Sequence, residues 1–233
     1  MWLERIAVTL FGNINQTHQV VMSLILRYMR ADDIREVSRI DCLCFEPPWS
    51  RDSYAFEIKE SKISHMVVLE EQAPLIPAML PNDDGWIQRL SGWIRQESPA
   101  IGKSGLIVGY GGLWKIDGEA HVSTIATHPN HRGRGYGEIL LAGMFRKALR
   151  LKAEYLVLEV RVSNAVAQNL YRKYGFSRHG RKRNYYRSNN EDAYDMRVSL
   201  DSSVRQRFGQ LYQQLQHSQG FHDAYSLVTH PRW

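Results

Sequence analysis

The chain has 233 residues, a length typical of one domain with extensions or of two small domains. Hydrophobic residues make up 43% and charged residues 23%, a composition that favours a packed globular chain and excludes a disordered or fibrous one. The net charge of +6 favours anionic partners such as phosphates or nucleic acid, without choosing among them.

Cysteine usage and hydropathy indicate a cytoplasmic protein. Cys42 and Cys44 are separated by one residue, too close for a disulfide framework, and no histidine cluster with metal-ligand spacing accompanies them. No apolar run approaches the ~18 residues needed to span a bilayer. Polar residues also interrupt the apolar patches of residues 1–26, where a signal peptide needs a continuous apolar region. We therefore expect a reducing compartment, no membrane contact and no metal.

The first predicted elements are a strand over 24–28 and a helix that starts near Ile34, whose apolar residues recur at helical spacing. Met22 stands just before this strand, so we expect residues 1–23 to be an N-terminal extension, with an overlong reading frame as the alternative. A helix over 50–58 and a strand over 66–69 follow.

Residues 71–104 predict an insert in the fold. Four prolines and the Asn-Asp-Asp-Gly cluster at 82–85 interrupt the alternation of helices and strands. We expect a loop here, with one short helix around 86–94.

The remaining elements alternate in a way that predicts a mixed α/β sheet. Asp117-Gly118 is a strong two-residue turn signal for an antiparallel hairpin. The predicted elements are strands over 106–114 and 120–127, a helix over 140–149, a strand over 155–162, a helix capped by Ser163 or Asn164 that ends at Gly175, and strands from 176 and over 194–200. One domain thus covers 24–200, and the C-terminal extension 201–233 contains a peripheral helix.

The sharpest local signal is His-Arg-Gly-Arg-Gly-Tyr-Gly at 131–137, between a predicted strand and a predicted helix. Gly133, Gly135 and Gly137 lack side chains, so backbone N–H groups there can approach a ligand closely. The helix N-terminus adds a partial positive charge. The spacing fits neither a P-loop nor a Rossmann fingerprint. The segment therefore predicts an anion site suited to a pyrophosphate, with a flexible basic turn as the alternative.

Further motifs follow in a fixed order: Ile125-Ala126-Thr127-His128-Pro129, the glycine loop, Leu158-Glu159-Val160-Arg161, Ser163-Asn164, and Leu170-Tyr171 with Gly175-Phe176. This order resembles the GNAT superfamily of acetyl-CoA-dependent N-acetyltransferases. Phe45–Ser50 (FEPPWS), 158–164, and Arg183-Asn184-Tyr185-Tyr186 before Glu191-Asp192-Ala193 resemble its RimI type, which acetylates the N-terminal alanine of a small-subunit ribosomal protein. The resemblance covers about residues 24–200, apart from the insert.

The resemblance implies a GNAT-like, mostly antiparallel central sheet flanked by helices, with acetyl-CoA as acetyl donor. It implies that backbone groups of Ile125, Ala126 and Thr127 bind the acetyl-pantetheine arm and that Asn164 contacts CoA. The pyrophosphate would be held by Gly133, Arg134, Gly135, Tyr136, Gly137 and Glu138. Glu159 would be the proton acceptor and Tyr171 the proton donor.

These roles agree with the chemistry of acetyl transfer. An α-amine of pKa about 8 is largely protonated at neutral pH, so it needs a base before it can attack a thioester. The departing thiolate then needs an acid, which a phenol can provide. Taken alone, Glu159 could also be an exposed strand residue, Tyr171 a core aromatic and Asn164 a helix cap.

The leading hypothesis is therefore an N-alpha-acetyltransferase acting on the N-terminal alanine of a ribosomal protein. The alternatives are a GNAT enzyme for another amine (lysine, polyamine or antibiotic) and a non-catalytic acyl-CoA-binding or ribosome-docking module. Phe45–Ser50 and Tyr185-Tyr186 are expected to form walls around a small first residue. The basic run 178–187 is interpreted as a solvated hairpin arm, with weak ribosome or RNA contact as the alternative. His121, His128 and His131 are given structural or surface roles.

Overall fold

The computed structural model describes residues 23–72 and 105–228. The strands are β1 (Ser23–Tyr28), β2 (Ser64–Gln72), β3 (Leu106–Ile116), β4 (Glu119–Thr127), β5 (Tyr155–Arg161), β6 (Ser177–Tyr186), β7 (Glu191–Ser199) and β8 (Phe221–Asp223). The helices are α1 (Ile34–Cys44), α2 (Arg51–Lys59), α4 (Tyr136–Arg150), α5 (Ala165–Lys173) and α6 (Ser202–Gln219), with short 3-10 turns at Ala31–Asp33 and Pro129–His131.

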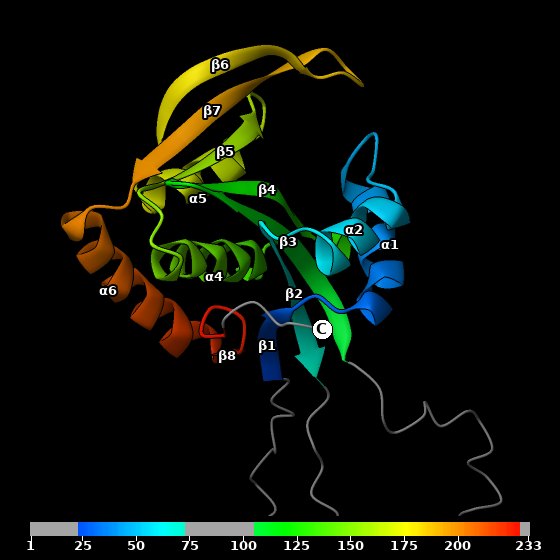
Figure 1. The fold of residues 1–233 in the computed structure, drawn as a ribbon, viewed down its shortest axis with the longest axis horizontal. Helices are drawn as coiled ribbons and strands as arrows, with labels where there is room; N and C mark the ends of the chain where they lie inside the picture. Colours follow the sequence, from blue (N-terminus) through cyan, green and yellow to red (C-terminus); the bar gives the residue numbers. More distant parts are fainter. Residues whose placement is uncertain (1–22, 73–104, 229–233) are drawn as a thin grey trace, which may run out of the picture.

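The strands form one eight-stranded sheet in the order β6-β7-β5-β4-β3-β2-β1-β8 (Figure 1). Only β4 with β5 and β1 with β8 run parallel among the described strands, and the other neighbours are antiparallel. The prediction of a single mixed, mostly antiparallel sheet flanked by helices is confirmed.

Two hydrophobic cores lie on opposite faces of the sheet. Helices α4, α5 and α6 contribute to the larger core, and α1 and α2 to the smaller one (Figure 1). Successive side chains of a strand point to opposite faces, so in β2 Val67 and Leu69 join the larger core while Met66 and Val68 join the smaller. Because both faces of β2 are covered, its central residues 66–69 form a continuous apolar run.

The start of α2 and the turn after β3 occur where the sequence places them, whereas α4 begins four residues before the predicted 140–149 and β7 three residues before the predicted 194–200. The Ser50 hydroxyl accepts a hydrogen bond from the backbone N–H of Ser53 at 3.0 Å and caps α2. Asp117, with φ of 45°, forms the turn between β3 and β4. In the predicted insert, residues 71 and 72 belong to β2, and the expected helix at 86–94 lies outside the described residues.

The C-terminal residues differ most from expectation. The helix expected after Asp201 is present as α6, but it buries Phe208, Tyr212 and Leu215 in the larger core. Strand β8 then pairs with β1 and extends the sheet, although its three residues are too few to produce a periodic signal. The described part of the predicted C-terminal extension therefore belongs to the same core. None of the described helices has the length and apolar character needed to cross a membrane.

An opening in the sheet positions the candidate site. Strands β4 and β5 pair only from Glu119↔Tyr155 to His121↔Val157, although β4 continues to Thr127 and β5 to Arg161. A bulge at Ser123 interrupts the register of β4 with β3 just beyond the last of these pairs. The two strands therefore separate, and the opening between them leads into two cavities.

Candidate active site

Two cavities adjoin at the opening between β4 and β5. We call the first, of about 540 Å³, the carboxylate cavity because Glu159 lines it, and the second, of about 710 Å³, the glycine-loop groove because residues 133–137 border it. Both are lined by Cys44, Phe45, Ile125, Asn164 and Tyr171. The sequence-predicted residues of donor binding and of acid–base chemistry are thus brought to one continuous site.

The glycine loop adopts a conformation that favours glycine. Gly133 and Gly135 have φ of +78° and +83°, the left-handed region, and Gly135 is the N-cap of α4. A Cβ atom added at Gly133 would meet no atom within 4 Å, so the loop is open at this point. The first N–H groups of a helix lack partners within the helix, so this end of α4 can bind an anion.

The side chains around the loop are largely engaged with the protein. The Tyr136 hydroxyl donates to the Glu71 carboxylate, and Glu138 accepts hydrogen bonds from Lys173 at 2.5 Å and Tyr174 at 2.8 Å. Of the loop residues predicted to hold a pyrophosphate, Gly133, Gly135, Tyr136, Gly137 and Glu138 line the groove and Arg134 does not. The Arg134 guanidinium lies 3.9 Å from the Glu71 carboxylate instead.

The end of β4 offers free backbone groups to the groove. Ile125, Ala126 and Thr127 pair with β3 on one side, but β5 has already separated from them on the other. All three line the groove, and alternate residues of the strand turn their N–H and C=O groups to the open side, where these groups can bind a ligand. The Thr127 oxygen already accepts from the Cys44 thiol at 3.7 Å. Asn164 lines both cavities, and its side-chain oxygen also caps α5 by accepting from Ala167 N at 3.1 Å.

Glu159 lines the carboxylate cavity, and both oxygens of its carboxylate have partners. His121 Nε2 lies 2.8 Å from Oε2 and Lys182 Nζ lies 2.5 Å from Oε1. Burial by itself would raise the pKa of Glu159, but the hydrogen bonds and charges of His121 and Lys182 outweigh burial and lower the pKa to about 2. Glu159 is therefore a firmly ionised carboxylate with weak basicity.

Tyr171 is buried in α5 and lines both cavities. Burial, and to a lesser degree the nearby Tyr186 hydroxyl, raises the pKa of Tyr171 well above that of a free phenol. The hydroxyl keeps its proton at neutral pH, as a free phenol does, and the raised pKa makes it a weaker acid. Its position on the lining of both cavities makes it the candidate proton donor.

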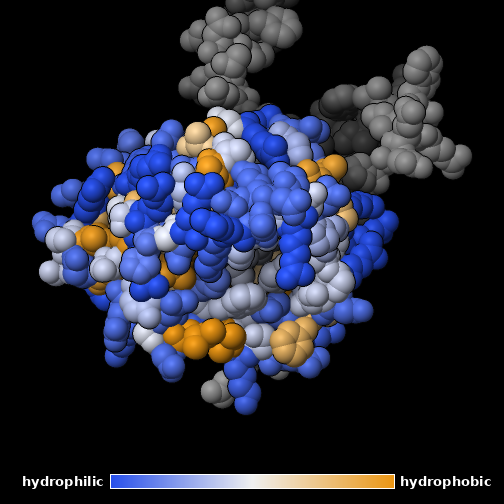
Figure 2. Space-filling view, turned by 90° about the horizontal axis from the view of Figure 1, so that it is seen from above, coloured by the Kyte–Doolittle hydropathy of each residue, from blue (hydrophilic) through white to orange (hydrophobic). Residues whose placement is uncertain are grey.

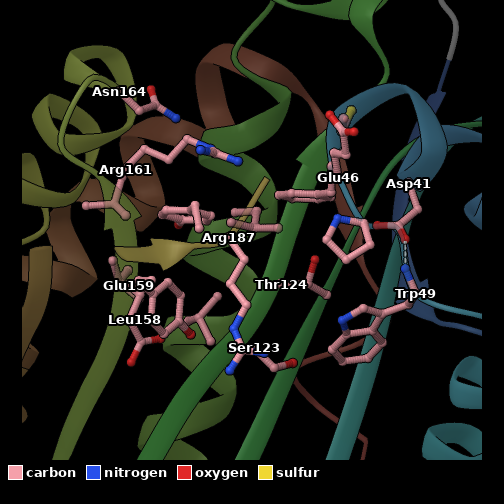
Figure 3. Close-up of a pocket in the computed structure, with 18 of the residues that line it drawn as sticks. Asp41, Glu46, Trp49, Ser123, Thr124, Leu158, Glu159, Arg161, Asn164 and Arg187 are labelled. Carbon is pink, nitrogen blue, oxygen red and sulfur yellow. Dashed lines mark hydrogen bonds between the residues drawn. The ribbon is translucent and has the colours of Figure 1, made fainter. Parts of the chain in front are cut away.

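Two segments far apart in the sequence form the walls of the carboxylate cavity. Figure 3 shows Trp49 and Glu46 on one side of β4, and Glu159, Arg161 and Asn164 on the other. The wall from the α1–α2 connection is fixed by Asp41, whose carboxylate accepts from Trp49 N at 2.6 Å and from the Tyr110 hydroxyl. The opposite wall comes from Tyr185, Tyr186 and Arg187, where β6 ends. The expected aromatic walls are therefore present.

Three residues of the site had no functional role in the sequence analysis. His121 contacts Glu159. The two residues meet because β4 pairs with β5, and the periodicity of the sequence does not reveal the register of that pairing. Lys182 belongs to the basic run, yet it contacts Glu159. The buried Ser123 hydroxyl lines the carboxylate cavity and has no hydrogen-bond partner among the described residues, so it can bond to a ligand.

The basic run lies on β6, at the edge of the sheet, with most of its side chains exposed. Figure 2 views the molecule from above, the side on which β6 and β7 lie in Figure 1, and this surface is mostly hydrophilic. Arg181 pairs with Asp192 at 2.6 Å, and Lys182 with Glu159, so two of its cations are already neutralised. Contact with RNA through this strand stays a prediction.

Within residues 23–72 and 105–228, no cluster of three or more His, Cys, Asp or Glu side chains could hold a metal ion.

Comparisons with known proteins agree with this geometry. Residues 34–176 match the Acetyltransferase (GNAT) family. The chain is 32% identical over 176 residues to a candidate ribosomal protein bS18-alanine N-acetyltransferase of Bacillus subtilis, an alignment that covers 76% of this chain and 95% of the relative.

Solved structures give the same picture of the fold. The ribosomal-protein-S18-alanine N-acetyltransferase of Escherichia coli has a TM-score of 0.56 at 21% identity, with 76% of this chain and 94% of that chain covered. A candidate acetyltransferase of Salmonella typhimurium, solved with acetyl-CoA, has a TM-score of 0.54 at 16% identity, with 77% of this chain and 95% of that chain covered.

Proposed function

Because the chain belongs to the acetyltransferase (GNAT) family and is an N-acetyltransferase, we propose that it uses acetyl-CoA to acetylate the N-terminal α-amine of a ribosomal protein, with alanine as the acetylated residue. The names of the Bacillus subtilis relative and the Escherichia coli structure support this acceptor. The single observation that carries the choice of an α-amine is the weakly basic Glu159 in the carboxylate cavity.

The glycine-loop groove fits the proposed donor. Gly133 and Gly135 have no side chains, so this stretch of backbone is open to a ligand. Their positive φ disfavours other residues, and a Cβ atom at Gly135 would be only 2.8 Å from Gln219 Nε2. Such a bare loop at a helix N-terminus suits a pyrophosphate, and the open edge of β4 suits an amide-containing arm. When bound, acetyl-CoA supplies an activated acetyl thioester.

The low pKa of Glu159 separates two classes of acceptor amine. At pH 7.5 about a third of the molecules of an α-amine with pKa near 7.8 are already neutral, against about 0.1% of lysine side chains with pKa near 10.4. A lysine acceptor therefore requires about 3.5 kcal/mol more for deprotonation. A carboxylate with a pKa of about 2 is poorly suited to provide it, so the site suits the α-amine.

The residues of the site then have distinct roles. The ionised Glu159 attracts and orients the acceptor ammonium, and because its pKa is about 2 it relays the ammonium proton through water to solvent rather than holding it. The free N–H groups of β4 stabilise the negative charge that develops on the acyl oxygen. Tyr171 gives its proton to the departing thiolate, and the proton that the acylated nitrogen loses after the attack returns to Tyr171 through water, so each turnover releases one proton to solvent.

The charges of the carboxylate cavity argue against a polyamine acceptor. The charged side chains that line it are three carboxylates and two guanidinium groups, Asp41, Glu46, Glu159, Arg161 and Arg187. Asp41 is hydrogen-bonded within the wall, and Glu159 to His121 and Lys182. The lining thus carries one more carboxylate than guanidinium groups, a balance that suits a single ammonium better than a ligand with several ammonium groups.

The pH dependence of two matched peptides tests this proposal. One peptide carries a free N-terminal alanine and a blocked lysine, and the other a blocked N-terminus and a free lysine. For the first, kcat/KM should rise with a midpoint near pH 7.8 and reach a plateau near pH 9, as the α-amine loses its proton. No step should occur between pH 4 and 6, because Glu159, with a pKa of about 2, is already ionised there.

For the second peptide we expect a rate at least about 100-fold lower at pH 7.5, still rising above pH 9. Faster acetylation of the lysine peptide at neutral pH would contradict the α-amine proposal and favour a lysine acetyltransferase.

A further inference from the structure

The C-terminal segment 202–228 lies outside the family match at residues 34–176, yet it packs on the helix that carries the glycine loop. Phe208 of α6 stacks on Phe145 of α4 with ring centroids 4.4 Å apart. The Arg146 guanidinium lies 4.6 Å from the centre of the Tyr212 ring. These contacts fix α6 against α4.

The last residue of α6 lies against the glycine loop. A Cβ atom placed on Gly135 would be only 2.8 Å from Nε2 of Gln219, so the Gln219 carboxamide packs directly against this glycine. Gly220 follows in the left-handed conformation and ends α6, and its N–H donates to Gln216 O at 2.9 Å. The position of Gln219 is therefore set by the end of the helix.

A second contact connects α6 to the same groove. The Arg207 guanidinium donates to the backbone oxygen of Lys173 at 3.1 Å. Lys173 in turn forms an ion pair with Glu138, which lines the glycine-loop groove. Helix α6 thus touches the surroundings of the groove at two separate points.

From these contacts we infer that Gln219 is a positioning residue of the donor site. Its carboxamide supports Gly135 in the conformation that leaves the N-terminal N–H groups of α4 exposed to the groove. The carboxamide is also neutral and carries N–H groups, so it places no negative charge beside the expected pyrophosphate. This inference rests on the proposed donor, acetyl-CoA, and adds to its site a residue from outside the family match.

Calorimetry of CoA binding to the full chain tests the role of Gln219. Gln219→Glu keeps the size of the side chain and adds a negative charge, so we expect about tenfold weaker CoA binding, with the loss reduced at high salt. Gln219→Ala should weaken binding about threefold without a salt dependence. Pantetheine, which lacks the phosphates, should bind the native chain and Gln219→Glu equally. With saturating acetyl-CoA, kcat should stay within about twofold while KM for acetyl-CoA rises.

Gln213→Glu is the matched control, because Gln213 is an exposed residue of the same helix and the charge change is identical. CoA affinity of Gln219→Glu equal to that of Gln213→Glu would overturn the inference and leave the proposed donor intact. A native chain that does not bind CoA would overturn the donor proposal together with the inference.

Discussion

Glu159→Gln and Tyr171→Phe are each expected to lower kcat by about 10²–10⁴-fold, the usual contribution of a positioned base or acid. Glutamine keeps the shape of Glu159 but loses the negative charge that attracts and deprotonates the acceptor ammonium. Phenylalanine keeps the ring of Tyr171 in the core but loses the proton for the departing thiolate. Steady-state kinetics with an N-terminal alanine peptide measures both losses.

CoA affinity, measured by calorimetry, should remain within about threefold of the native value in both variants, because neither change alters the glycine loop. Glu154→Gln and Tyr155→Phe are suitable controls, since these residues precede or begin β5 and line neither cavity. If Glu159→Gln and Tyr171→Phe both retain near-native turnover, the assigned proton acceptor and proton donor are wrong.

Gly135→Val should abolish most of the donor affinity, with CoA binding at least about 100-fold weaker. Gly135 has φ of +83°, a conformation that costs a β-branched residue about 1–3 kcal/mol. The new side chain would also displace Gln219 and stand beside the N-terminus of α4. Calorimetry measures the loss of CoA binding, and chemical denaturation measures the accompanying loss of stability.

Gly209→Val is the matched control, because a side chain at this position of α6 meets no atom within 4 Å. It should bind CoA as the native chain does. Native CoA affinity in a folded Gly135→Val variant would show that the loop does not contact the donor.

Much of the fold follows from local patterns in the sequence. The turn at Asp117-Gly118, the cap at Asn164 and the apolar spacing of α4 all act between residues close in the chain, so the sequence predicts them directly. The same holds for the glycine loop. The sequence predicts a peripheral helix at α6 because its many glutamines mask the stripe of Phe208, Tyr212 and Leu215 that the helix buries.

The electrostatic surroundings of the site depend on pairing that no local pattern encodes. His121 and Lys182 reach Glu159 only because β4 lies beside β5 and the β6–β7 hairpin curves over them. The sequence therefore predicts Glu159 as a candidate base but not its pKa of about 2. The bulge that places Ser123 in the cavity likewise results from the register between β3 and β4.

The central claim, acetylation of a ribosomal protein at its N-terminal α-amine, is tested most directly by mass spectrometry of ribosomal-protein N-termini from cells with and without this protein. Cells that express Glu159→Gln in its place serve as the control for an indirect effect. We predict that one ribosomal protein with N-terminal alanine is acetylated only when the native protein is present. Unchanged ribosomal N-termini in all three samples, together with loss of acetyl groups from lysines or free amines, would contradict the claim.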